Sequence, residues 1–543
     1  MRGRFLAISI LGLLCGLSAR AQRGAAKDTV IKGATIEIIQ SYTPEVKRTP
    51  RPTPVPSLPP VDTTTPVLQH YVPAQTLFYS YGSLPLRPLA LTLSTQEPEY
   101  ENYVKLGGGN LSTIYMDAGI GGLNGDNYET AIQLKHLSQS GSIADQKVSL
   151  TGVDAQGMYR KGSKAFGVQL GIHNNRYHYY GYDHSKYTYG IGAVRQSFTD
   201  INLAVDMKDE LNEGRRFSYH PRINAGLFSD RLDASETTFG IDIPTTYTID
   251  SNLQLYANVG ITLTSFKNSV TNQSNNIFQL EPGIRFSKGI FTGHAGMSPT
   301  WGNGTAYFLP DAEINFTLPG TQFMFFAGVE GSLVQNSYRQ LATLNPFMSN
   351  LYNVQQTKST EVFGGIKSNL GKHITFNGRL SWWQYNDLPI FINDTAGDKK
   401  QFLLLYDSKV NAIGLQAAIR YHIAETFSIG FSGQWMNFYK KSYAEVWHRP
   451  GVNFTGDVLA EPIRKLTINA YISFIDELYA LDNGNRSLKL SSILDIGAGA
   501  EYEIIKRLNI FIQANNLLNS KYQRWYGYDA FGLNVFAGAR LKF

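Results

Sequence analysis

Cysteine is almost absent from this chain. Cys15 is the only one among 543 residues, and it lies in an apolar run at residues 5–17. A basic start, Met1-Arg2-Gly3-Arg4, precedes the run, and Ala19-Arg20-Ala21 follows it. This order predicts a secretory signal peptide, residues 1–21, cleaved after Ala21. The mature chain then has no disulfide, and its fold must rest on buried surface and hydrogen bonds.

Long apolar runs and a strong charge of one sign are also missing. No stretch after residue 21 reaches roughly 18 consecutive apolar residues, so we expect no transmembrane helix. The formal net charge of +6 falls to about +3 when Arg2, Arg4 and Arg20 leave with the signal peptide. That charge is too weak, over so long a chain, to predict a nucleic-acid partner.

Catalytic and phosphate-binding sequence motifs are equally scarce. The sequence contains no G-x-S-x-G nucleophile elbow. Gly107-Gly108-Gly109 lacks the Lys-Ser/Thr that a phosphate-binding loop requires. We therefore expect a protein that is not an enzyme, with no catalytic, cofactor-binding or metal-binding residues and no cofactor.

The densest group of metal-ligating residue types is one histidine-tyrosine segment. It holds three histidines and four tyrosines: His173, His178, His184, Tyr177, Tyr179, Tyr180 and Tyr182. A metal centre would need fixed geometry and supporting hydrogen bonds, which spacing alone does not supply. We interpret the segment as an aromatic outer loop at the membrane interface.

Proline is concentrated near the N-terminus. Twelve of the 22 prolines fall between Pro44 and Pro98. The stretch 49–56, with proline at every second position, is typical of an extended polyproline spacer. Residues 22–100 are thus predicted to form a proline-rich periplasmic arm. An apolar island at 34–39 could add as a strand to a partner.

Alternation of apolar and polar residues dominates from residue 101 to the end. In the last eleven residues, one alternate set is entirely apolar: Leu533, Val535, Ala537, Ala539, Leu541 and Phe543. A period of two places this set on one face of a strand. The same pattern recurs at 466–474, 413–421, 427–435 and 508–515. It predicts an all-β, antiparallel transmembrane barrel of about 20 strands (range 16–22) over residues 101–543.

The spacing of the strands supports a barrel. Short connections are expected at 503–506, 460–465, 422–426, 370–373, 319–320, 287–289 and 250–252. Long connections are expected between them, at 475–488, 437–451, 384–409 and 332–360. Outer-membrane barrels alternate short periplasmic turns with long outer loops in this way. The alternation is lost upstream of residue 230, around 196–213. We also expect a β-bulge at Pro282, because proline cannot donate to a sheet ladder.

One C-terminal segment carries a family resemblance. Asn516-Leu517-Leu518-Asn519-Ser520-Lys521-Tyr522, followed by Trp525-Tyr526-Gly527-Tyr528-Asp529 and a last strand ending in Phe543, resembles the close of TonB-dependent receptor barrels. The resemblance reaches back over the last third of the chain, through Trp447-His448-Arg449-Pro450. Members of that family carry a globular plug before the barrel. About 80 proline-rich residues are too few for one, so the chain is similar to plugless relatives in the Bacteroidota.

Two functions remain open at this point. The resemblance implies an outer-membrane barrel that transports or binds a solute, with outer-membrane lipids around it and the arm and C-terminus in the periplasm. The alternative is a non-transporting accessory barrel of an assembly or secretion complex, which would hold periplasmic or outer-membrane protein partners through residues 22–100.

Overall fold

The computed structural model describes residues 102–543, apart from 122, 124, 210–215, 350–352, 395–396, 424–425, 483 and 485. The predicted signal peptide (1–21) and arm (22–100) lie outside these described residues. No helix in the described part of the chain is long and apolar enough to span a membrane.

Antiparallel strands make up nearly all of the regular structure. In chain order, those of the main sheet are β1 (Tyr103–Gly109), β2 (Thr113–Ile120), β3 (Tyr128–Ser140), β4 (Lys147–Lys161), β5 (Lys164–His178), β6 (Arg195–Asp209), β7 (Phe217–Tyr219), β8 (Arg222–Asp230), β9 (Ser235–Thr248), β10 (Leu253–Lys267), β11 (Asn272–Ser274), β12 (Ile277–Lys288), β13 (Phe291–Gly302), β14 (Thr305–Thr317), β15 (Phe323–Val334), β16 (Thr357–Leu370), β17 (Ile374–Asn386), β20 (Val410–Ile423), β21 (Phe427–Tyr439), β22 (Val452–Ile463), β23 (Leu466–Asp476), β26 (Ile493–Ile505), β27 (Leu508–Asn515) and β30 (Asn534–Lys542).

The sheet closes on itself, because β1 pairs with β30 as well as with β2. Of its 24 strands, β7 continues the register of β8 on β9 across Pro221, and β11 continues that of β12 on β10. The barrel therefore has 22 full strands. The predicted all-β barrel is confirmed, with two strands more than the estimate of about 20 and at the upper limit of the 16–22 range.

The two faces of each strand differ as the alternation predicts. In β30 and the residue after it, Leu541 and Phe543 are 51% and 56% exposed on the outer face. Asn534 and Phe536 on the inner face are 3% and 8% exposed. Elsewhere the outer surface carries large apolar side chains such as Phe308, which is 69% exposed. An apolar outer band around a closed barrel is what a lipid environment stabilises.

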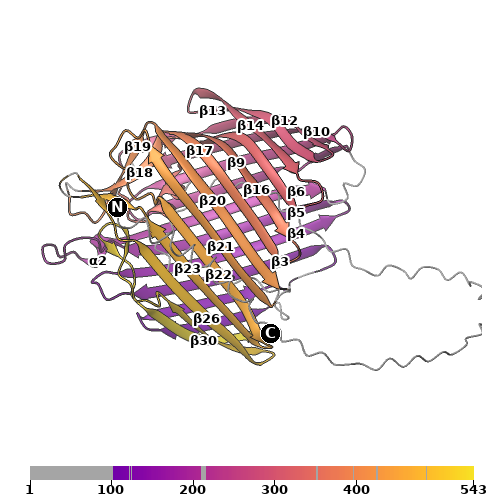
Figure 1. The fold of residues 1–543 in the computed structure, drawn as a ribbon. Coiled ribbons are helices and arrows are strands. Elements are labelled where there is room, and N and C mark those ends of the chain that lie inside the picture. The colour runs from indigo at the N-terminus through magenta and orange to yellow at the C-terminus, as the bar shows by residue number, and fades with distance from the viewer. Residues whose placement is uncertain are drawn as a thin grey trace, which may run out of the picture. The chain divides into compact units, whose positions relative to one another are not determined.

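The two ends of the barrel also differ (Figure 1). The end that holds the C-terminus has short turns, and four of these contain a glycine with positive φ: Gly162, Gly289, Gly320 and Gly371. Long connections gather at the opposite end, where β18 (Leu388–Asn393), β19 (Phe402–Asp407) and α2 (Ile191–Val194) lie. After residue 250, all the connections predicted to be short lie at one end of the barrel, and all those predicted to be long lie at the other. Upstream, alternation fails because several turns at the long-loop end are themselves short, as at 231–234 and 110–112.

The bulge expected at Pro282 is not present. Pro282 pairs with Ala257 of β10 in unbroken register. On its other side, pairing with β13 stops after Gln279 and resumes at Gly283 without a shift of register. The strand accommodates the missing N–H by a gap in the ladder, so no extra residue is inserted.

The long loops contain regular structure of their own. Two short helices are α2 (Ile191–Val194) and α3 (Tyr338–Leu344). Three hairpins are β18 (Leu388–Asn393) with β19 (Phe402–Asp407), β24 (Tyr479–Leu481) with β25 (Ser487–Lys489), and β28 (Gln523–Trp525) with β29 (Tyr528–Asp529). Helix α3 begins with a capping box in which Ser337 and Gln340 satisfy each other's backbone N–H. These elements give the loops defined shapes.

Candidate functional site: the barrel interior and the loops that close it

The inner wall of the barrel is polar. On β10, β13 and β14, the Tyr256 hydroxyl and the His294 Nε2–H both donate to Asp311, each at 2.9 Å. Farther round the wall, Arg379 of β17 pairs with Glu361 of β16 at 2.8 Å. Such side chains are stable on an inner face only if they are paired or hydrated. The arrangement gives the lumen a surface suited to water and polar solutes.

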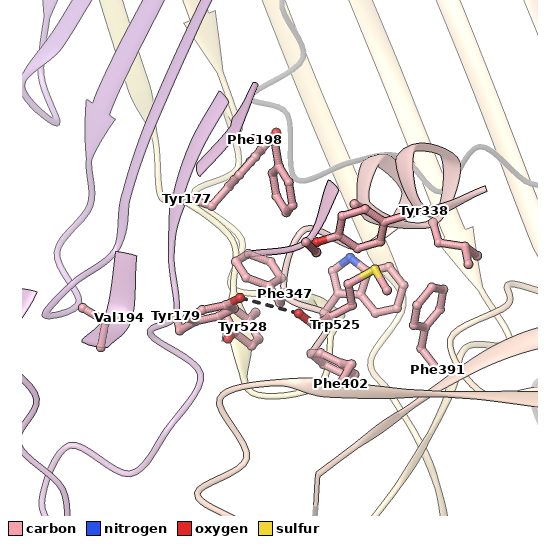
Figure 2. Close-up of a cluster of buried hydrophobic side chains, with 14 of the residues drawn as sticks. Tyr177, Tyr179, Val194, Phe198, Tyr338, Phe347, Phe391, Phe402, Trp525 and Tyr528 are labelled. Carbon is pink, nitrogen blue, oxygen red and sulfur yellow. Dashed lines mark hydrogen bonds between the residues drawn. The ribbon is translucent and has the colours of Figure 1, made fainter. Parts of the chain in front are cut away.

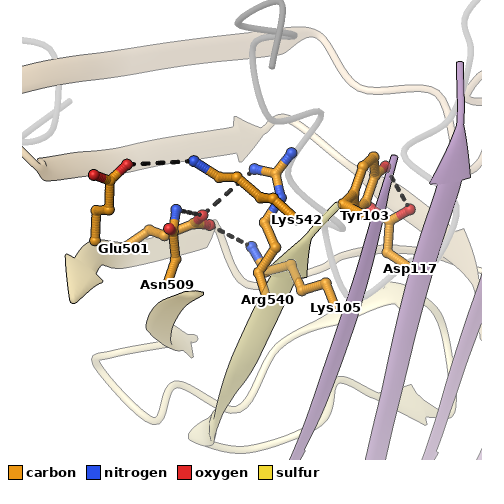
Figure 3. Close-up of polar contacts among 8 residues, drawn as sticks. Tyr103, Lys105, Asp117, Glu501, Asn509, Arg540 and Lys542 are labelled. Atoms are coloured by element: carbon orange, nitrogen blue, oxygen red, sulfur yellow. Dashed lines mark hydrogen bonds and ion pairs between the residues drawn. The ribbon is translucent and has the colours of Figure 1, made fainter. Parts of the chain in front are cut away.

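A charged cluster joins the first and last strands from inside (Figure 3). Lys105 of β1 pairs with Glu501 of β26 at 2.8 Å, and Arg540 of β30 approaches the same carboxylate at 3.4 Å. Asn509 of β27 donates to Glu501 at 2.7 Å. Neighbouring Lys542 and Glu503 are 3.5 Å apart. One carboxylate thus ties together strands on both sides of the seam where the barrel closes.

A cavity of about 610 Å³ lies along the wall toward the short-turn end. Its polar lining includes Lys367, Asn377, Arg420 and Asp457. Arg420 and Asp457 form a bidentate pair, with distances of 2.8 and 3.0 Å. Both side chains are about half exposed, at 48% and 54%, so the pair is hydrated and contributes little to stability. The cavity is lined by charges of both signs, so its lining does not indicate one class of ligand.

The long-loop end is occupied by a buried aromatic cluster, which we call the loop core (Figure 2). Its largest members with less than 2% exposure include Trp525, Tyr338, Tyr528 and Phe402. Phe347 stacks on Tyr528 with ring centroids 3.8 Å apart. The cluster draws on the connections β5–β6, β15–β16, β17–β20 and β27–β30. Loops normally lie at the surface, so a shared core indicates that these four fold as one body.

The strands that carry the loop core show that it crosses the barrel mouth. Among the 22 strands, β5 and β6 are the fifth and sixth, β15 and β16 the thirteenth and fourteenth, and β27 and β30 the last two. These three pairs are spaced about a third of the circumference apart. Tyr180, Phe347 and Tyr528, one from each connection, nevertheless lie in mutual ring contact. Contact among them requires the loops to meet over the lumen.

His448 connects three of the loops. Its Nδ1–H donates to the carbonyl oxygen of Phe391 at 2.9 Å, and its Nε2 accepts from the backbone N–H of Tyr526 at 3.3 Å. Its ring stacks on Trp525 at 5.1 Å between centroids. Burial lowers the pKa of His448 to about 3, so the imidazole is neutral at physiological pH. A neutral ring satisfies both hydrogen bonds, one as donor and one as acceptor.

Two arginines lie beside this histidine. Arg524 Nη1 donates to the carbonyl oxygen of His448 at 2.9 Å. Arg449 donates from Nε and Nη2 to the carbonyl oxygen of Pro389, at 3.1 and 3.0 Å. Arg449 and Arg524 are only 8% and 4% exposed. Burial, with the charge of Arg449 as a second cause, lowers the pKa of Arg524 to about 9.

The histidine-tyrosine segment is placed differently from our expectation. His173, Tyr177 and His178 lie on strand β5, and only the part from Tyr179 onward belongs to a long-end connection. There Tyr179, Tyr180 and Tyr182 are buried in the loop core and do not lie at the membrane interface. The three histidines have different neighbours: His173 faces Asp154, His178 Nδ1–H donates to the Lys147 carbonyl oxygen at 3.4 Å, and His184 Nε2–H donates to the Tyr180 carbonyl oxygen at 3.1 Å. Within the described residues, no group of three or more His, Cys, Asp or Glu side chains is placed to hold a metal ion.

The loop core and its buried arginines were not foreseen from the sequence. Their members come from connections hundreds of residues apart, and aromatic density in 177–189 and 522–528 was the only local signal. The motifs that carry the resemblance do fall at the site. Asn516 and Asn519 adopt positive φ at 48° each, and Asn516 donates to the carbonyl oxygens of Ser520 and Phe531. They hold the base of the loop that presents Trp525.

Comparison with known proteins agrees with the fold. No family model matches the sequence, and no curated protein is similar to it. Among solved structures, the FrpB iron transporter of Neisseria meningitidis has a TM-score of 0.64 at 12% identity, over 82% of this chain and 81% of that chain. The siderophore receptor PirA of Acinetobacter baumannii gives 0.64 at 9% identity, over 82% and 81%. The ferric-catecholate import receptor Fiu of E. coli K12 gives 0.60 at 10% identity, over 82% of each.

These likenesses show that the chain has the same barrel fold as the receptors. Combined with the apolar outer band, the fold supports a location in the outer membrane. Identities of 9–12% carry no ligand or partner from those proteins to this one.

Proposed function

We propose that the protein is an outer-membrane barrel that binds a solute and passes it through its lumen, with the loop core as a gate at the outer end. The observation that carries the proposal is a polar inner wall in a 22-strand barrel whose long-loop end is closed, among the described residues, by packed loops. Barrels of this size enclose a lumen that needs closing. Loops held by side-chain packing can part and close again, which strands paired around a closed barrel cannot do.

We also propose a role for residues 22–100 and an orientation for the barrel in the membrane. Residues 22–100 are proline-rich and, in our proposal, form a periplasmic arm and no globular plug. The C-terminus is periplasmic, and the loop core faces outward. Support comes from the expected pattern of outer-membrane barrels, in which short turns face the periplasm and long loops face outward. A barrel without a plug would depend on its loops for closure.

Single-channel conductance in planar bilayers tests this gate. We expect the wild-type full chain to be closed for most of the recording, since the loop core spans the mouth. Substituting Phe347→Ala together with Tyr528→Ala removes the stacked pair and should give steady conductance. Phe308→Ala removes an equally large ring from the outer face and serves as the matched control. The absence of conductance in both the wild type and the double variant would rule out a solute path through the lumen.

A second candidate function is favoured by the same closed mouth. A barrel that never opens suits an accessory subunit of an assembly or secretion complex, with residues 22–100 as the docking element. Gentle detergent pull-down from native outer membranes, read by mass spectrometry, tests this. Stoichiometric recovery with assembly or secretion components, lost when residues 29–60 are deleted, would support the accessory role. Recovery of the barrel alone would favour transport.

A further inference from the structure

The surroundings of Arg524 are unusual for a buried cation. Its side chain is 4% exposed, and the acceptor that the described residues give it is the backbone carbonyl oxygen of His448. Among the described residues, no carboxylate pairs with Arg524, and the charge that acts on it is that of Arg449. Burying a guanidinium without a counter-charge is destabilising. A bound counter-charge would offset this cost.

Unused donors lie at the same place. The Arg524 Nε–H is buried with no acceptor among the described residues. The same holds for the Nε1–H of Trp525, a residue that is 1% exposed. The Arg524 guanidinium lies 4.9 Å from the centre of the Trp525 ring, so the two residues belong to one patch. A patch that offers positive charge and the unused N–H donors of Arg524 and Trp525 has the chemistry of an anion receptor.

Three loops build this patch. Arg449 and His448 come from the β21–β22 connection, and Arg524 and Trp525 from β28 in the β27–β30 connection. Pro389, which fixes Arg449 through its carbonyl oxygen, lies on β18 in the β17–β20 connection. A ligand held here would therefore touch the segments that close the mouth.

We infer that Arg524, Arg449 and Trp525 form a binding site for an anionic oxygen group, a carboxylate or a phosphate. The inference deepens the proposed function, on which it rests, by assigning the solute a negative charge. The group is carried by the solute, or it is a free inorganic ion that completes the loop core. Since the loops bury the site, the anion enters when they part, and charge-assisted hydrogen bonds to Arg524 then stabilise the bound state.

Calorimetric titration of the purified full-length protein in detergent tests the site. The probes are inorganic phosphate, glycerol phosphate and citrate, each at constant ionic strength against chloride. We expect saturable binding to the wild type. Arg524→Met should weaken it roughly tenfold or more, since a hydrogen bond to a charged group contributes about 1.5–3 kcal/mol. Arg524→Lys, which keeps the charge, should retain part of the affinity.

Arg486→Met is the matched control, because it removes the same charge from a neighbouring outer connection where the side chain is 84% exposed. It should bind like the wild type. Tighter binding of glycerol phosphate or citrate than of phosphate assigns the site to a solute group, and the reverse assigns it to a resident ion. A wild type that binds none of the three probes overturns the inference, whatever the variants do. Conductance is measured separately, so a silent barrel that still binds phosphate would contradict the proposed transport and leave the site standing.

Discussion

The Nε2 atom of His448 accepts a hydrogen bond from the backbone N–H of Tyr526, with 3.3 Å between the two nitrogens. The bond joins the β21–β22 connection to the β27–β30 connection, 78 residues farther along the chain. Only the neutral imidazole can accept it, because Nδ1 already donates its proton to Phe391. The junction between these loops therefore depends on the protonation state of one buried ring.

The packing of these loops should weaken as the pH falls. Burial lowers the pKa of His448 from 6.5 to about 3, so the unfolded loops bind the proton more readily than the folded ones. The stabilisation is complete above about pH 6.5 and declines as the pH falls toward about 3, by at most about 1.4 kcal/mol per pH unit. Tryptophan fluorescence and limited proteolysis between pH 7 and 4 should show the loops loosening.

His448→Gln should flatten this pH dependence, since glutamine does not titrate. His373→Gln is the control, because His373 lies in a short turn at the other end of the barrel and is exposed. Equal pH profiles for His448→Gln and the wild type would show that another group is responsible.

Glu501 should be important for closing the barrel. Its side chain is 15% exposed and accepts from Lys105 and Arg540 across the seam. Glu501→Gln leaves two inward cations without their carboxylate, a change that costs on the order of 3 kcal/mol at buried pairs. The heat-modifiability transition on semi-native gels should move to lower temperature. Glu129→Gln, which breaks an exposed pair with Arg160, should leave it nearly unchanged.

Gly538 is expected to tolerate no side chain. A Cβ placed there would lie 1.8 Å from the carbonyl oxygen of Leu106 and 2.6 Å from the Cα of Gly107, both on the facing strand β1. Gly538→Ala must push β1 and β30 apart where the barrel closes, so we predict little folded barrel in isolated membranes. Gly157→Ala on β4 is the control, because its Cβ would meet nothing nearer than 3.7 Å. Normal folding of Gly538→Ala would show that the seam is looser than described.

The barrel could be predicted from the sequence because the patterns that determine it, alternation within a strand and the spacing of turns, are local. Alternation in β30 and β23 fixes which side chains face outward, and turn spacing fixes which connections are long. Strand number was underestimated because alternation says little where turns at the long-loop end are short. Pro282 was misread because a gap in one ladder and a bulge give the same sequence signal.

The loop core could not be predicted, because no local pattern encodes it. Tyr180, Phe347 and Tyr528 meet only because the closed barrel brings their loops to one mouth. The tyrosines near residue 180 were correctly placed in a long connection, but their side chains turn toward the mouth. Burial of Arg524 likewise depends on contacts from three loops, so its lack of a counter-charge is visible only in the folded chain.

Thiol labelling of intact cells tests the central claim, that the loop core closes the outer end of the lumen. Cys15 is the only cysteine and lies in the predicted signal peptide, so introduced cysteines report alone. Ala418→Cys on the cavity wall should resist an impermeant maleimide too large for general porins, while exposed Lys186→Cys should react at once. Adding Phe347→Ala and Tyr528→Ala should make Ala418→Cys reactive. Rapid labelling of Ala418→Cys with the loops intact would contradict the account.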